Sequence, residues 1–333
     1  MSGLRPMTHA VLSGPMRPLG KVLEREHMRA LGFTRTSGLA RWYNGLAYGP
    51  TLRQRRSQYE SGSAELPSDN GSDGASGIEI EEGFALDESR SLPHLERLLD
   101  EMDEVIEERG GRNWNAHRPF LQDILGADGV VRYPSLLDFA TSSEVVAPIA
   151  RHFGYVPHLS QENFPPPVRV MESTTKFDPQ PEGPYRSSQL WHRDQHSSPT
   201  FYVIVLLRET TSQSGPLHYL SKSTSERVAA ALRYGSRRAP HRVSDEVMDS
   251  LVDPQEVRTL CGPPGTVLLI DSSQCFHFGS RNAVKPRYQV QYSFISPVRN
   301  DFGDLIHERR RLPVRSGDSR LRRMVLERTS TGE

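Results

Sequence analysis

The spacing of apolar residues first predicts helices. Between residues 92 and 109, apolar side chains recur every three or four positions, which is typical of a helix with one buried face. Ser91 is the expected N-cap, and Gly110 is the expected end of this helix. The same spacing from Pro134 to Phe153 predicts one or two further helices that end at Gly154.

Beyond residue 154 the pattern changes to short runs rich in β-branched and aromatic residues, each bounded by proline or glycine. The predicted strands are 168–174, 201–207, 217–220, 266–270 and 288–294. Residues 78–86 predict an earlier strand pair or the entry to a strand, and residues 221–260 predict an insert of helices and loops. Helices followed by many short strands predict a mainly β fold, in which a helical layer packs on a β-sandwich or barrel.

The two ends of the chain differ from this central part. Residues 1–56 mix arginines with scattered apolar residues and predict an N-terminal extension, with one short helix at 22–31. Residues 57–77 are mostly Ser, Gly, Asp and Asn, which predicts a flexible linker or loop. The main domain is then expected at 78–308. Residues 309–333, with eight arginines between Arg309 and Arg328, predict a solvated basic tail.

Composition narrows the class of protein. The 333 residues carry 41 basic and 41 acidic side chains, so no overall charge favours nucleic acid or membrane as a partner. Two cysteines are too few for a disulfide framework and are typical of a reducing compartment. No apolar run approaches the ~18 residues of a membrane span. We therefore expect a cytoplasmic protein.

The candidate chemistry lies in two stretches of the strand-rich region. His192 and Asp194 are two residues apart, and side chains at that spacing project from the same face of a strand. His277 follows another apolar strand about eighty residues later. Two histidines and one carboxylate on one face of a metal leave adjacent positions open, a set typical of non-haem Fe(II) oxygenases. The sequence therefore predicts a metal site at His192, Asp194 and His277.

A basic residue, Arg287, follows His277 by ten residues. Arg287 begins the predicted strand after His277, where a guanidinium could grip the distal carboxylate of a 2-oxo acid chelated to iron. Arg281 is the alternative, although it lies outside a regular strand pattern. Gln189 flanks the ligand pair and is a further candidate for contact with the cosubstrate. A second alternative pairs His192 with His196 at helical spacing in a zinc site, but no Glu accompanies that pair.

At this point the sequence resembles the phytanoyl-CoA dioxygenase family of Fe(II)/2-oxoglutarate oxygenases. The order His192-x-Asp194, His277 and Arg287 carries the resemblance, together with two flanking segments. These are Gln189-Leu-Trp-His-Arg-Asp194 and Gly265-Thr-Val-Leu-Leu-Ile-Asp271, the latter followed by His277-Phe-Gly279. The segment Gly215-Pro-Leu-His-Tyr-Leu-Ser-Lys-Ser223 matches only in part, because the family usually continues into Pro-Gly-Ser-His.

The resemblance covers about residues 78–300 and implies a double-stranded β-helix, with an N-terminal helical layer. It also implies Fe(II) as the metal, 2-oxoglutarate as cosubstrate, and O2-dependent oxidation of a small organic substrate with release of succinate and CO2. Two alternatives stay open from the residues themselves. One is a cupin-like metalloenzyme that does not use 2-oxoglutarate, and the other is a catalytically silent barrel used for binding.

Overall fold

The computed structural model describes residues 11, 13–14, 16–18, 20–22, 32–62, 66, 77–162, 165–194, 199–237, 239–303 and 310–329. Its helices are α2 (Phe33–Glu60), α3 (Leu95–Arg109), α4 (Gly129–Arg132), α5 (Ser135–Ala140), α6 (Ser143–Phe153), α7 (Lys222–Leu232), α8 (Asp245–Asp249) and α10 (Arg320–Leu326). Its strands are β1 (Phe84–Asp87), β2 (Leu121–Asp123), β3 (His158–Leu159), β4 (Val168–Ser173), β5 (Thr200–Leu206), β6 (Leu217–Tyr219), β7 (Arg258–Leu260), β8 (Val267–Asp271), β9 (His277–Phe278) and β10 (Arg287–Ile295).

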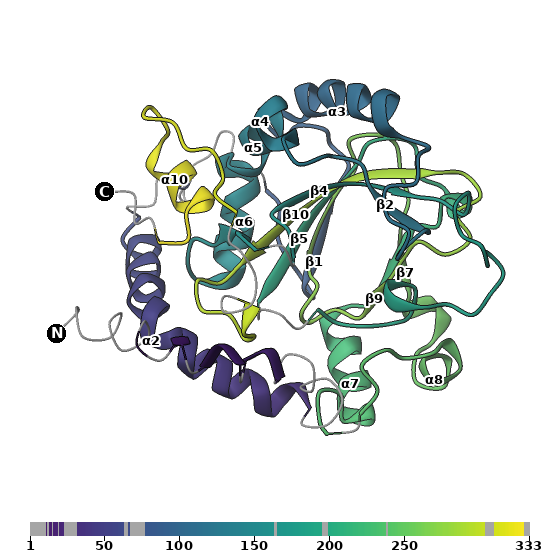
Figure 1. The fold of residues 1–333 in the computed structure, drawn as a ribbon, viewed down its shortest axis with the longest axis horizontal. Helices are drawn as coiled ribbons and strands as arrows, with labels where there is room; N and C mark the ends of the chain where they lie inside the picture. Colours follow the sequence, from purple (N-terminus) through teal and green to yellow (C-terminus); the bar gives the residue numbers. More distant parts are fainter. Residues whose placement is uncertain are drawn as a thin grey trace.

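The strands form two antiparallel sheets that face each other (Figure 1). The larger sheet has the order β1-β8-β5-β10-β4-β2, with β3 paired to one end of β10, and the smaller has the order β7-β6-β9. Residues 191–192 extend the smaller sheet, because His192 forms an antiparallel bridge with His277 in β9.

The order in which the chain visits the two sheets defines the fold. From β4 the chain passes to the 191–192 segment of the smaller sheet and then to β5 of the larger sheet. It returns to the smaller sheet for β6 and β7, and then places β8, β9 and β10 alternately in the larger, smaller and larger sheets. This is the connectivity of a double-stranded β-helix of the jelly-roll type. The predicted mainly β fold with flanking helices is confirmed.

Alternation along the central strands separates two cores. In β5, Phe201, Val203 and Val205 face the helical layer and belong to the largest hydrophobic cluster. The neighbouring Tyr202, Ile204 and Leu206 face the space between the sheets. All seven residues of β5 are buried, which agrees with the unbroken apolar run that predicted this strand.

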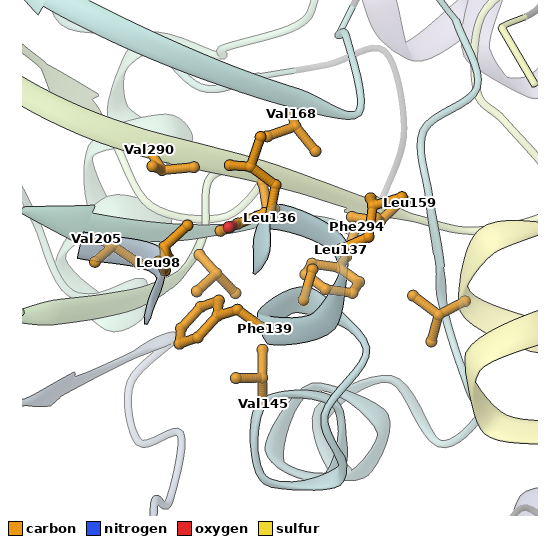
Figure 2. Close-up of a cluster of buried hydrophobic side chains, with 14 of the residues drawn as sticks. Leu98, Leu136, Leu137, Phe139, Val145, Leu159, Val168, Val205, Val290 and Phe294 are labelled. Atoms are coloured by element: carbon orange, nitrogen blue, oxygen red, sulfur yellow. The ribbon is translucent and has the colours of Figure 1, made fainter. Parts of the chain in front are cut away.

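The helical layer covers the outer face of the larger sheet. Figure 2 shows Leu136, Leu137 and Phe139 of α5 packed with side chains of the strands, including Val205 and Val290. The periodicity therefore located these helices correctly. One detail was wrong: α3 begins after His94, which has a left-handed backbone (φ 63°), and not after Ser91. Of the two alternatives at 78–86, the structure shows the entry to a strand: β1 alone forms there and joins the larger sheet beside β8.

The N-terminal region contains a long helix that the sequence pattern did not predict. Helix α2 runs from Phe33 to Glu60 and so passes through the expected boundary between residues 56 and 57. Residues 63–65 and 67–76 of the predicted linker, and residues 23–31 of the helix predicted at 22–31, lie outside the described residues. No helix in the described ranges is long and apolar enough to cross a membrane.

The basic tail is also part of the folded body, which corrects the prediction of a solvated helix. Four apolar residues of α10 are buried: Leu321, Met324, Val325 and Leu326. Arg328 is 2% exposed, its guanidinium lies 3.6 Å from the ring centre of Tyr48 in α2, and it donates to the Pro297 carbonyl. Arg55 of α2 is fully buried and donates to the carbonyls of Met324, Glu327 and Arg328.

Candidate metal centre

Backbone pairing brings the two predicted histidine ligands together. The His192 amide donates to the His277 carbonyl at 3.1 Å, and the His277 amide donates to the His192 carbonyl at 2.9 Å. The two imidazole rings lie 4.3 Å apart between centres. Trp191 points to the opposite face and packs edge-on against Phe278 at 4.5 Å. The period-2 alternation that we used in the sequence thus holds on both segments.

Asp194 completes the group. Its amide donates to the Ser272 carbonyl at 2.9 Å, which fixes the segment against the turn after β8. One carboxylate oxygen lies 3.4 Å from His277 Nε2, and the other lies 4.0 Å from His192 Nε2. The three candidate ligand atoms all lie within 4.8 Å of one another, a spacing that one metal ion could bridge.

Both imidazoles are oriented for binding through Nε2. His192 Nδ1 lies 2.8 Å from the Leu190 carbonyl, and His277 Nδ1 lies 3.0 Å from the Cys275 carbonyl. A carbonyl accepts only from a protonated Nδ1, so the lone pair of each neutral ring is on Nε2. Burial also lowers the pKa of His192 well below its ordinary value, which favours the neutral ring that a metal requires.

Tyr202 supports the carboxylate and was not singled out from the sequence. Its hydroxyl forms a hydrogen bond with Asp194, and burial together with that carboxylate raises the pKa of Tyr202 well above its ordinary value. A neutral phenol can therefore donate to Asp194 at all physiological pH values. The alternation of β5 already placed Tyr202 on the face opposite Phe201, and this was the available signal.

The turn between β8 and β9 positions two of the three ligands. Asp271 is fully buried, and its carboxylate accepts from the Ser273 hydroxyl at 2.6 Å and from the Ser273 amide at 3.1 Å. His152 Nε2 of α6 lies 2.9 Å from the other oxygen. The turn carries the Ser272 carbonyl that holds Asp194, and it leads directly into His277. Asp271 therefore holds in place the turn that positions Asp194 and His277.

We expect Asp271→Asn to weaken iron binding by about 10- to 100-fold, as is usual when a group that orients metal ligands is lost. Unfolding should also become easier by about 1–3 kcal/mol, because buried donors would lose an acceptor. Equilibrium dialysis with Fe(II) and urea unfolding measure the two effects. Asp253→Asn is the matched control, since Asp253 caps an exposed turn through the Gln255 amide. Unchanged iron affinity in Asp271→Asn would contradict the role.

Arg287 lines the same cavity as the triad and is 3% exposed. Its Nη2 donates to Ser173 Oγ at 2.9 Å and to Ser280 Oγ at 3.3 Å. Within the described part of the chain, its Nε and Nη1 have no hydrogen-bond partner, and no carboxylate pairs with it. Burial lowers the pKa of Arg287 to about 10, so the side chain stays charged at neutral pH. A buried charge with free donors favours an incoming anion.

The other two candidates for cosubstrate contact lie behind the cavity. Arg281 donates to the Gln189 carbonyl and pairs with Asp245 at 2.9 Å, so a carboxylate already neutralises it. The Gln189 side chain donates to the Ser280 carbonyl at 2.9 Å and accepts from the Arg186 amide at 3.2 Å. Neither residue lines the cavity. The structure therefore places Gln189 as a support for Ser280, and not in the cavity as expected.

Cys275 lies close to His277 in the sequence but does not join the ligand group. Cys275 is buried, its sulfur lies 3.8 Å from the carbonyls of Glu82 and Gly83, and it is not part of the ligand group. His196, the alternative partner of His192, lies outside the described residues. A larger open cleft of about 840 Å³ lies along residues 77–91, but it contains none of the three ligands.

Comparison with known proteins gives one curated relative. No protein-family model matches the chain. A protein from Stutzerimonas stutzeri, described as a probable alpha-ketoglutarate-dependent hypophosphite dioxygenase, is 28% identical over 138 residues. These residues are 41% of this chain and 45% of that protein, so the match spans less than half the length of the relative.

Solved structures with some likeness include EctD from S. alaskensis with 2-oxoglutarate and 5-hydroxyectoine, at 13% identity and a TM-score of 0.42 over 69% of this chain and 86% of that chain. The carbocyclase SnoK from nogalamycin biosynthesis is 18% identical, with a TM-score of 0.40 over 72% and 90% of the two chains. HygX from Streptomyces hygroscopicus, with nickel, 2-oxoglutarate and hygromycin B, is 12% identical, with a TM-score of 0.35 over 64% and 82%. The assignment of the fold rests on the strand connectivity described above.

Proposed function

We propose that this protein is an Fe(II)/2-oxoglutarate-dependent dioxygenase that oxidises a small substrate, and that it is related to the phytanoyl-CoA dioxygenase family. One observation carries the proposal. A single cavity contains the His192, Asp194 and His277 ligand set together with Arg287, a buried cation that no described carboxylate neutralises. A metal enzyme without a 2-oxo acid has no use for that second feature. The likeness to an alpha-ketoglutarate-dependent enzyme agrees with it.

The donor set fits Fe(II). Two neutral imidazoles and one carboxylate on one face leave adjacent positions for a chelating cosubstrate and O2. When bound, iron and 2-oxoglutarate would supply an O2-dependent oxidation, in which the cosubstrate becomes succinate and CO2 and one oxygen atom of O2 enters succinate while the other enters the substrate.

The residues of the chain supply position and electrostatics. The carbonyls of Leu190 and Cys275 hold the two imidazoles with Nε2 toward the metal position. Tyr202 donates to Asp194 and so limits the directions that its carboxylate can take. Arg287, itself held by Ser173 and Ser280, would bind the distal carboxylate of 2-oxoglutarate through charge-assisted hydrogen bonds.

Hypophosphite is the first substrate to assay, because the Stutzerimonas stutzeri relative is named as a probable hypophosphite dioxygenase. The balanced reaction would convert hypophosphite, 2-oxoglutarate and O2 into phosphite, succinate, CO2 and a proton. One P–H bond is replaced by a P–O bond, and the two electrons lost by phosphorus complete the reduction of O2. Phosphorus NMR would detect the product directly.

The cofactor set can be tested without any substrate. Metal-free protein is titrated under argon with Fe(II) and then with 2-oxoglutarate, and the visible charge-transfer band of a chelated 2-oxo acid is recorded. We expect a band in the wild type and in Arg281→Ala, and none in His192→Ala or at ordinary cosubstrate concentrations in Arg287→Ala. Bound iron without a band would support the cupin-like metalloenzyme instead. Failure to bind iron would leave a barrel used for binding.

A further inference from the structure

A second group of arginines lines the cavity beside the metal centre. Arg118 comes from the loop before β2, Arg169 from β4 and Arg242 from the loop between α7 and α8. The position of Arg242 is fixed by its neighbour Val243, which exchanges two backbone hydrogen bonds with Trp191 at 3.1 and 2.9 Å. Arg242 is therefore tied to the segment that carries His192 and Asp194.

Two of these three cations have no carboxylate partner of their own. Arg169 Nε lies 3.3 Å from Asp123 Oδ2, which forms a salt bridge. Among the described residues, neither Arg118 nor Arg242 forms a salt bridge, and Arg242 Nη1 is buried with no hydrogen-bond partner. An unpaired guanidinium donor inside a cavity is costly unless a ligand satisfies it.

The carboxylate that interacts electrostatically with both Arg118 and Arg242 is Asp194. Burial lowers the pKa of Arg118, the nearby Arg169 lowers it further, and the Asp194 carboxylate acts in the opposite direction. Burial also lowers the pKa of Arg242, again against Asp194. Asp194 is one of the three candidate metal ligands. When a divalent metal binds to Asp194, the negative charge of this carboxylate no longer compensates the arginines. This part of the cavity then gains positive charge.

These arginines are not a second contact for the distal carboxylate of 2-oxoglutarate. Arg287 is held by Ser173 and Ser280, and its electrostatic neighbour is Cys261. The neighbours of Arg118 and Arg242 are instead Asp194 and Tyr202. The cavity therefore offers two separate positions for negative charge. 2-Oxoglutarate would fill one of them and occupy the metal with its other end.

The size of the cavity limits what can bind at the second position. Its volume is about 110 Å³, whereas pockets for drug-sized ligands typically measure about 300–1,000 Å³. A substrate that shares this space with 2-oxoglutarate has few non-hydrogen atoms. We propose that Arg118 and Arg242 bind the substrate as a small oxoanion beside the metal. This inference rests on the proposed dioxygenase function and names the class of its substrate.

Anion binding is measured by isothermal titration calorimetry under argon, with hypophosphite, phosphite and formate as probes. Each titration is run on metal-free protein and on protein loaded with Fe(II) and 2-oxoglutarate. The variants are Arg118→Gln and Arg242→Gln. Arg237→Gln is the matched control, because Arg237 is an exposed arginine of the same insert and does not line the cavity.

We expect at least one probe to bind the loaded wild type and Arg237→Gln equally, and to bind each cavity variant at least ~10-fold more weakly, since each loses a charge-assisted hydrogen bond. The charge-transfer band should persist in both variants, which shows that they are folded and loaded. Equal affinity in wild type and cavity variants, or no binding to a wild type that shows the band, would overturn the proposal. A missing band in the wild type would instead refute the cofactor set, and the metal-free titrations would then decide whether the arginines bind an anion.

Discussion

Asp194→Ala should abolish iron-dependent turnover, with a fall of at least ~10³-fold, because several kcal/mol of metal-derived stabilisation would be lost with the ligand. Asp194 is the only carboxylate in the described ligand group, so the two remaining imidazoles cannot balance the charge of the metal. Iron affinity should fall together with turnover. Equilibrium dialysis with Fe(II) and the rate of succinate formation measure the two quantities.

The control for Asp194 is His196→Ala. The sequence alone allows a zinc site in which His192 and His196 are the ligands and Asp194 has no role. In the geometry of the triad, His277 takes that place, with Nε2 at 3.4 Å from Asp194. His196→Ala should therefore keep iron affinity and turnover within about a factor of three, a change worth less than ~1 kcal/mol. Full activity in Asp194→Ala, together with loss of activity in His196→Ala, would refute the assignment of the ligands.

Arg287→Ala should weaken 2-oxoglutarate binding by at least ~10²-fold, because truncating one partner of a buried, charge-assisted pair costs about 2–5 kcal/mol. Arg287→Lys should recover only part of this loss, since an ammonium keeps the charge without the planar set of donors. Iron affinity should change little in both variants. Titration of the charge-transfer band gives the dissociation constants. Equal 2-oxoglutarate affinity in wild type and Arg287→Ala would contradict the role.

A stability measurement separates a binding role for Arg287 from a structural one. The Arg287 charge is buried with two donor nitrogens unsatisfied among the described residues. Arg287→Met should therefore leave the cosubstrate-free protein as stable as the wild type or more stable, because apolar replacement of an uncompensated buried charge is often stabilising. A Tm that falls by several degrees in Arg287→Met would show that Arg287 holds the two sheets together.

The sequence predicted the residues of the candidate metal centre because the pattern around each of them is local. His192 and Asp194 share a strand face through period-2 alternation, His277 follows a strongly apolar strand, and Arg287 begins the next strand. The position of Arg118 and Arg242 in the cavity could not be predicted in this way. Arg118 and Arg242 lie in loops 124 positions apart, and neither loop has a periodic pattern that fixes the direction of a side chain. Only the bridge between Val243 and Trp191 brings one of them to the metal position.

Sequence patterns also failed at the two ends of the chain, for a different reason. Helix α2 contains Gly38, Gly45, Gly49 and Pro50, which weaken any local preference for a helix. Two of its buried polar residues, Asn44 and Arg55, instead donate to carbonyls far along the chain. Asn44 donates to the carbonyls of Arg299 and Asp301. The arginines of the basic tail looked solvated for the same reason, since no nearby sequence shows that Arg328 covers Tyr48.

The contacts of α2 also set an order of events during synthesis. Asn44 finds its partners 255 and 257 residues later in the chain. Arg55 donates to carbonyls 101 and 102 residues later, and to three more that follow it by 269 to 273 residues. A ribosome that adds roughly 5–20 residues per second must therefore work for many seconds before α2 can complete its contacts. During that interval the buried face of α2, including Tyr43, has nothing from residues 299–328 to cover it. Helix α2 is thus among the last elements to complete its packing, although it is made early.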